Sequence, residues 1–149
     1  MSRAGTTGAP AYEFVEGATS DLAFVARGGS PEAVFTAAAD ALLAATLEQP
    51  EHLGEGERRR LALEEPTLDL LLLRWLNELV YLRDAEQLLL RCGRIAIGRD
   101  GGFHLEAELS GDRVGPRHRL LADVKAATAH GLWMGETRDG WEAKVTLDV

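Results

Sequence analysis

The segment from Pro66 to Leu82 constrains the fold of this chain most, because it has the pattern of a helix that is apolar on two sides. Pro66 and Thr67 are typical of a helix start. A broad apolar stripe follows at helical spacing, formed by Leu68, Leu71, Leu72, Trp75, Leu76, Leu79 and Leu82. A second stripe on the opposite side consists of Leu70, Leu73, Val80 and Tyr81. Such a helix is covered on both sides, either inside a layered domain or by a partner protein.

A second helix is predicted over residues 31–47. Ser30 is a suitable N-cap, Pro31 suits the first helical position, and Glu32 places a negative charge where the helix dipole favours it. Small and apolar residues then recur at helical spacing, namely Ala33, Val34, Ala37, Ala38, Ala41, Leu42 and Ala45. This small face predicts close packing on a sheet.

Most of the remaining chain has the alternation and turn signals of strands. Strands are predicted over residues 22–26, 58–64, 88–98, 103–109, 124–134 and 141–149. In the fifth of these, alternation assigns one face to Val124, Ala126, Thr128, His130, Leu132 and Met134. The order of elements predicts an α+β domain over residues 11–149, with two principal helices and a mainly antiparallel sheet. Residues 1–10 are interpreted as a disordered leader.

Composition excludes several functions. The chain of 149 residues has a net charge of −8, which argues against direct RNA binding, because neutralising phosphates needs clustered Lys and Arg. The single cysteine, Cys92, excludes an intramolecular disulfide and a thiolate metal cluster. No apolar run approaches the ~20 residues of a membrane span, and no signal peptide is evident. These features predict a cytoplasmic protein without a membrane partner.

Carboxylates at the chain end form the first candidate site. Asp148 lies next to Val149, whose terminal carboxylate would place a second hard oxygen group at the same spot. Alternation puts Asp148 on the polar face of its strand, with Val149 and Leu147 facing inward. Asp21 is the second candidate, although each aspartate alone is more typical of a turn or cap. Such a pair would favour Ca²⁺ or Mg²⁺ over zinc, but spacing does not show that Asp21 and Asp148 meet.

Other chemistry finds little support in the sequence. The four histidines, His52, His104, His118 and His130, lack the i, i+4 spacing of a zinc site. No serine has the context of an activated nucleophile, and no Gly-rich phosphate loop is present. A metal-dependent hydrolase that uses the two aspartates stays an alternative, although no general base is evident.

Four blocks of the sequence together resemble the archease family. Two are specific: Trp-Leu-Asn-Glu-Leu at residues 75–79, and Val-Lys-Ala-Ala-Thr-Ala-His-Gly-Leu at residues 124–132. Two are weaker, the early segment that ends at Asp21 and the last five residues. Three positions differ from the residues that are common in the family: Ala18, Arg74 and Ala129.

The resemblance implies a protein cofactor of the RtcB-type RNA ligase, which seals tRNA halves in splicing and broken RNA in repair. Archeases promote the GTP-dependent guanylylation of that ligase and have no turnover of their own. The family's metal site, carried over, consists of Asp21, Asp148 and an oxygen of Val149, holding Ca²⁺, Mg²⁺ or Mn²⁺. The predicted surface for the ligase comprises Asn77, Glu78, His118, Lys125 and His130. A binding or chaperone module built on the same fold, using the second stripe of the 66–82 helix, is the other alternative.

Overall fold

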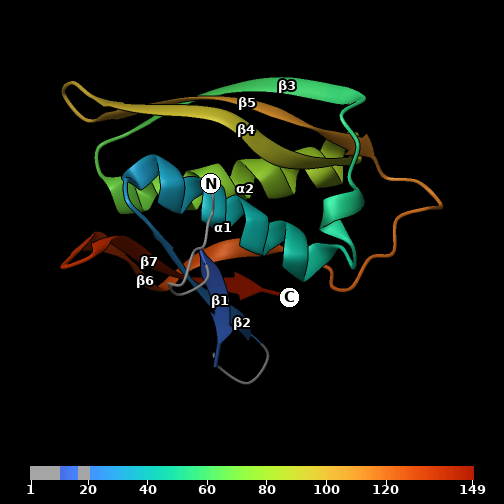
Figure 1. The fold of residues 1–149 in the computed structure, drawn as a ribbon, viewed down its shortest axis with the longest axis horizontal. Coiled ribbons are helices and arrows are strands. Elements are labelled where there is room, and N and C mark those ends of the chain that lie inside the picture. Colours follow the sequence, from blue (N-terminus) through green and yellow to red (C-terminus); the bar gives the residue numbers. More distant parts are fainter. Residues whose placement is uncertain (1–10, 17–20) are drawn as a thin grey trace.

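Two sheets enclose two helices in the computed structural model, which describes residues 11–16 and 21–149 (Figure 1). The predicted leader at residues 1–10 and Ala18 lie outside the described residues. The first sheet has the strand order β1-β2-β7-β6 and the second has the order β3-β5-β4. The elements are β1 (Tyr12–Val15), β2 (Asp21–Gly28), α1 (Pro31–Thr46), a short 3₁₀ helix (Pro50–His52), β3 (Glu57–Glu65), α2 (Leu68–Glu86), β4 (Leu88–Arg99), β5 (Phe103–Arg113), β6 (Ala126–Thr137) and β7 (Gly140–Asp148).

All neighbouring strands in the two sheets pair antiparallel, which confirms the predicted α+β class with two principal helices. Helix α1 begins at the predicted N-cap, Ser30, and α2 begins directly after the predicted start at Pro66 and Thr67. The Ser30 hydroxyl accepts a hydrogen bond from the Ala33 N–H at 3.2 Å, and the Thr67 hydroxyl accepts one from the Leu70 N–H at 3.4 Å. Neither helix of the described chain combines the length and apolarity that crossing a membrane requires.

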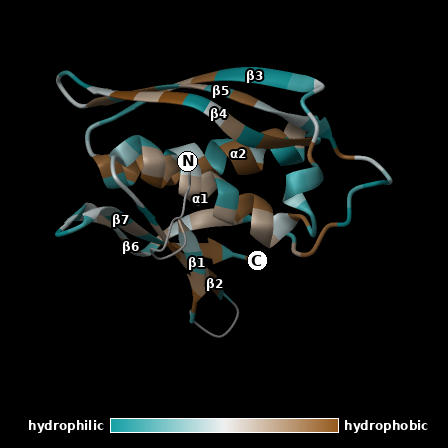
Figure 2. Ribbon diagram, viewed as in Figure 1, coloured by the Kyte–Doolittle hydropathy of each residue, from teal (hydrophilic) through white to brown (hydrophobic). Residues whose placement is uncertain are grey.

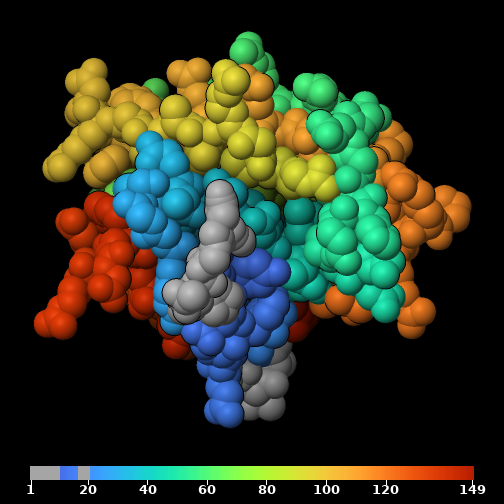
Figure 3. Space-filling model, viewed as in Figure 1, coloured from blue at the N-terminus to red at the C-terminus, as the bar shows by residue number. Residues whose placement is uncertain are grey.

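The two-sided helix α2 lies inside the domain and contacts strands of both sheets, as the layered-domain interpretation predicts. Its Trp75 is fully buried, and the indole N–H donates to the Phe35 carbonyl of α1 at 3.0 Å. Apolar residues lie on parts of both helices and of β2 and β4, whereas β3 is mostly hydrophilic (Figure 2). The second stripe is covered only in part, because Leu70 and Tyr81 are 42% and 60% exposed. In the space-filling view the start of α1 (light blue) fills the space between β4 (yellow) and the β6–β7 hairpin (red) (Figure 3).

A bulge in β6 overturns the predicted face of that strand. Thr128 pairs with Thr146, but the next paired residue, Trp133, is opposite Lys144. Residues 129–132 therefore face a single residue of β7. As a result, the residues that face inward before the bulge and those that face inward after it do not belong to one alternating series. Ala127 is buried instead of Ala126, while Met134, paired with the buried Ala143, keeps the inward position predicted for it.

The described part of the chain contains one strand more than predicted. Residues 12–15 form β1, which pairs with β2 from Tyr12 opposite Ala26 to Val15 opposite Ala23. The strand is short and lies at the sheet edge, and its Glu13 and Phe14 are exposed, so it lacks the apolar run that marks β2.

Candidate metal-binding edge

Asp21 and Asp148 lie directly opposite each other across two paired strands. Asp21 is the first residue of β2, Asp148 is the last residue of β7, and the antiparallel register makes them partners. Residues in such positions have Cβ atoms about 4.5–5.5 Å apart and their side chains on the same face of the sheet. We call Asp21, Asp148 and the adjoining Val149 the aspartate edge. The fold thus brings together the two aspartates that sequence spacing left apart.

The aspartate edge lies on the outer face of its sheet. The neighbouring pair, Leu22 and Leu147, faces the helices, and Leu147 is fully buried. The alternation of both strands then turns Asp21 and Asp148 away from the core. Val149 is 38% exposed, so the prediction that it faces inward with Leu147 is wrong: the strand ends at Asp148.

The chemistry of the aspartate edge fits a hard divalent cation. Two like charges directly opposite each other destabilise a strand pair, and none of the ion pairs among the described residues includes Asp21 or Asp148. A bound cation would offset that repulsion. Carboxylate oxygens suit Ca²⁺ or Mg²⁺, which complete their coordination with backbone carbonyls and water. Within the described chain no group of three or more His, Cys, Asp or Glu side chains could hold a metal ion, so a cation at this edge would need oxygen ligands besides the two aspartates.

The first residues of β6 complete this edge. Ala126 is the register partner of Asp148 on the side away from Asp21. The Lys125 backbone N–H donates to the Asp148 carbonyl at 2.7 Å, and the rest of Lys125 is exposed. His130, also exposed, lies in the β6 bulge, where its backbone N–H approaches the Thr128 hydroxyl at 3.4 Å. Lys125 therefore adjoins the edge through its backbone, whereas His130 lies further along β6, in the bulge.

Two residues of the predicted ligase surface are engaged inside the protein. The Asn77 side chain donates to the Ala127 carbonyl at 3.0 Å and accepts from the Ala127 N–H at 2.8 Å. The His118 ring is only 7% exposed and contacts Asp112. Glu78 is half-buried on α2 beside Arg74, which pairs with Glu65 at 3.1 Å across to β3. Their contact with a partner stays a prediction.

Asp112 is the centre of a polar cluster that the sequence did not indicate. Its Oδ2 accepts from the Gly54 N–H at 2.9 Å and from Arg117, and it lies 3.1 Å from His118 Nε2. His118 Nδ1 accepts from the Gly115 N–H at 2.8 Å, which assigns the ring proton to Nε2. Burial acts to raise the pKa of Asp112, but the hydrogen bonds from Gly54 and His118 and the Arg117 charge outweigh it and lower that pKa.

We expect Asp112→Asn to lower the free energy of unfolding at neutral pH by about 1–3 kcal/mol, because the donors from Gly54, Arg117 and His118 lose a charged acceptor. The pKa of Asp112 is lower in the folded chain, so its charge stabilises the fold above the ordinary pKa of about 3.9. That contribution is lost as the pH falls through the folded pKa. Urea unfolding between pH 7 and pH 3 checks this: the gap between wild type and variant should narrow with acid. Glu106→Gln, exposed on the same strand, is the control. A gap that does not change with pH contradicts the prediction.

Comparisons with known proteins agree on one family. The sequence model of the archease protein family matches residues 12–149. Relatives named "Protein archease" from Methanosarcina acetivorans and Methanosarcina mazei are each 33% identical over 141 residues, covering 93% of this chain and 95% of the relative. The solution structure of Methanobacterium thermoautotrophicum protein 1598 is similar with a TM-score of 0.82 and 29% identity, covering 93% of this chain and 99% of that one. A crystal structure from Thermotoga maritima, described as an archease and possible chaperone, shares the fold with a TM-score of 0.62 and 22% identity, covering 88% and 92%.

Proposed function

This chain belongs to the archease family, and on that premise we propose that it activates an RtcB-type RNA ligase in tRNA splicing and RNA repair. In this proposal the chain promotes the GTP-dependent guanylylation of the ligase and has no catalytic turnover of its own. The observation that carries the proposal is the cross-strand pairing of Asp21 with Asp148 at one end of a sheet.

We assign the aspartate edge as the part of the surface that contacts the nucleotide site of the ligase. Asp21, Asp148 and an oxygen of Val149 would hold a divalent cation, Ca²⁺, Mg²⁺ or Mn²⁺. When bound, the cation supplies positive charge that can neutralise phosphate oxygens of GTP. The two aspartates would hold this cation at the end of two paired strands. Because the sheet is already folded, the cation would reach the ligase without a rearrangement of this protein.

The exposed residues of the segment that begins at this edge are the ones we assign to contact with the ligase. Lys125, next to the edge, and His130, further along β6, are exposed, whereas Asn77 and His118 are occupied by internal hydrogen bonds. The net charge of −8 favours a protein partner over direct contact with RNA phosphates. The proposal places this activity in the cytoplasm.

A ligation assay tests the proposal. A limiting amount of an RtcB-type ligase from the same organism is given RNA with ligatable ends, GTP and Mn²⁺, with and without this protein. We expect wild type to raise the number of turnovers. Asp21→Asn and Asp148→Asn should reduce the stimulation at least tenfold, since even changes next to metal ligands cost about 10–100-fold.

Asp139→Asn, an exposed aspartate at the β6–β7 turn, is the matched control and should stimulate like wild type. Equal stimulation by all four proteins would remove the aspartate edge from the mechanism. No stimulation by wild type would contradict the proposed function itself.

A further inference from the structure

Three hydrogen-bonding ties hold the segment from Val124 to Ala127 in place. The Val124 carbonyl accepts from Arg83 at 2.5 Å, the Lys125 N–H donates to the Asp148 carbonyl at 2.7 Å, and Ala127 is bonded twice by Asn77. Two of these ties come from Arg83 and Asn77, which are side chains of α2. The third joins Lys125 directly to Asp148, which carries one carboxylate of the aspartate edge.

Asn77 occupies the place that another strand would take beside β6. Both backbone polar groups of Ala127 bond to its side chain, at 2.8 and 3.0 Å, so they point toward α2 and not toward β7. β6 is the last strand of its sheet, and an unpaired edge residue would otherwise bond to water. An amide side chain is suited to this role because it carries a donor and an acceptor together.

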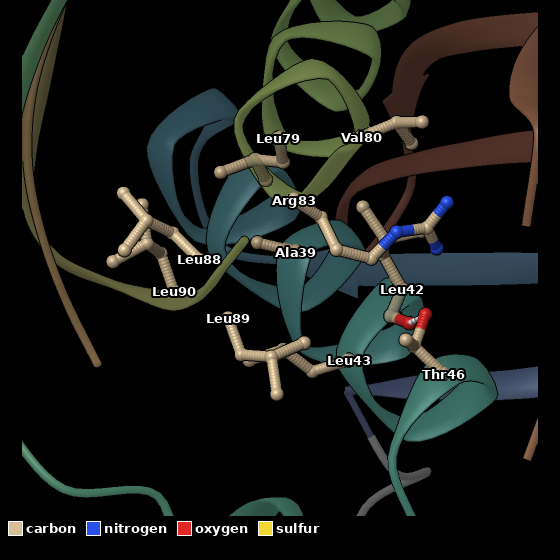
Figure 4. A pocket seen from close by; sticks show the side chains of 10 residues that line it. All are labelled: Ala39, Leu42, Leu43, Thr46, Leu79, Val80, Arg83, Leu88, Leu89 and Leu90. Atoms are coloured by element: carbon tan, nitrogen blue, oxygen red, sulfur yellow. Dashed lines mark hydrogen bonds between the residues drawn. The ribbon is translucent and has the colours of Figure 1, made fainter. Parts of the chain in front are cut away.

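Arg83 holds the residue where the chain enters β6. Its side chain is only 12% exposed, and its guanidinium also contacts Asp84 at 2.8 Å and Asp123 at 3.4 Å. In Figure 4 the Arg83 side chain leaves the last turn of α2 and turns its guanidinium away from the leucines of β4. The hydrocarbon part helps to line a cavity of about 20 Å³ between α1, α2 and β4, which is room for about one water molecule.

We propose that Asn77 and Arg83 are positioning residues for the aspartate edge: they fix the start of β6, which fixes Asp148 opposite Asp21 and so sets the affinity for the cation. The inference rests on the metal site of the proposed function. The physical reason is that Asp148 is the last residue of its strand, and strand ends fray unless they are tied down. Metal ligands bind well only when their supporting residues hold them within about 0.5 Å of the productive geometry.

Calorimetric titration with Ca²⁺ alone, and separately with Mn²⁺ alone, tests the inference on the full chain. We expect Asn77→Ala and Arg83→Ala to bind about tenfold more weakly than wild type, the lower end of the effect of residues that support metal ligands. Arg83→Lys keeps a cationic hydrogen-bond donor, so this variant should bind Ca²⁺ and Mn²⁺ more tightly than Arg83→Ala does. Amide hydrogen exchange of Lys125, measured by NMR without metal, should be faster in both alanine variants.

Arg74→Ala is the matched control. Arg74 also ties α2 to a strand, through the Glu64 carbonyl at 3.3 Å and the Glu65 carboxylate at 3.1 Å, but that strand is β3 in the other sheet. The Arg74→Ala substitution should leave the Ca²⁺ affinity and the amide hydrogen exchange of Lys125 unchanged. A loss of affinity equal to that of Asn77→Ala would show a general effect of loosening α2 and would overturn the positioning role.

The outcomes separate this inference from the proposed function. If wild type binds Ca²⁺ or Mn²⁺ and both alanine variants bind equally well, the positioning role is overturned and the metal site stands. If wild type binds neither ion, the proposed metal site is contradicted, and so is the effect of Asn77 and Arg83 on its affinity. If Asn77→Ala does not fold, which circular dichroism reveals, the pair Arg83→Ala and Arg83→Lys decides the question.

Discussion

Gly111→Ala is expected to destabilise the domain by about 3 kcal/mol or more, because it overpacks a site that has no room for one added carbon. Gly111 is buried in β5, the central strand of its sheet. A Cβ atom there would lie 1.8 Å from the Leu89 carbonyl oxygen and 2.9 Å from its carbonyl carbon. These are backbone atoms of the paired strand β4, so the clash is relieved only if the strands separate. Thermal unfolding measures the effect, with an expected fall in Tm of roughly 10 °C.

Gly98→Ala is the control for this substitution. Gly98 lies in β4 of the same sheet, and a Cβ atom there would meet nothing within 4 Å. We expect its stability to stay within about 0.5 kcal/mol of wild type or to rise, since alanine loses less backbone freedom on folding than glycine. Equal destabilisation by the two alanines would mean that strand separation is not the cause.

Trp75→Ala is expected to cost about 3–5 kcal/mol, the usual range for removing a large aromatic side chain from a core. Trp75 is fully buried between the sheets and packs against Phe35 with ring centroids 6.3 Å apart. The substitution leaves a cavity and also removes the indole N–H that bonds to the Phe35 carbonyl. Urea unfolding followed by far-UV circular dichroism measures the loss.

Trp75→Phe separates the two contributions to that loss. Phenylalanine keeps most of the apolar volume but cannot donate to the Phe35 carbonyl, so its cost should be about 1–3 kcal/mol. A phenylalanine variant as unstable as the alanine variant would show that the hydrogen bond, and not packing, governs the stability of this part of the core.

Local signals account for the parts of the fold that could be predicted from the sequence. Ser30, Pro31 and Thr67 mark helix starts through side-chain contacts that span only a few residues. The two apolar stripes of the 66–82 helix predicted cover on both sides, and the two sheets cover the first stripe and part of the second. The predicted face of β6 is wrong because the bulge at residues 129–132 inverts the alternation. Gly131, which has a φ of +67° inside that bulge, is a local signal of it that the alternation pattern alone does not use.

The candidate sites depend on contacts that are remote in sequence. Each of Asp21 and Asp148 has an ordinary local context, and only the pairing of β2 with β7 makes them neighbours. The resemblance to the family implied that the two aspartates share one metal site, but the hydrophobic periodicity of the chain gave no sign of it. Asp112 was missed because its partners, Gly54 and His118, come from two separate loops whose approach leaves no repeat or spacing in the sequence.

The two sheets differ in how much of the chain must exist before each can form. The β3-β5-β4 sheet and α2 come from the continuous stretch of residues 57–113, so they can assemble early during synthesis. The other sheet joins β2 to β7, two strands separated by residues 29–139. Such long-range pairing is slow and has to wait for the later strand. Asp21 therefore acquires its partner only after residues 140–148 have left the ribosome, and a partially synthesised chain has no aspartate edge.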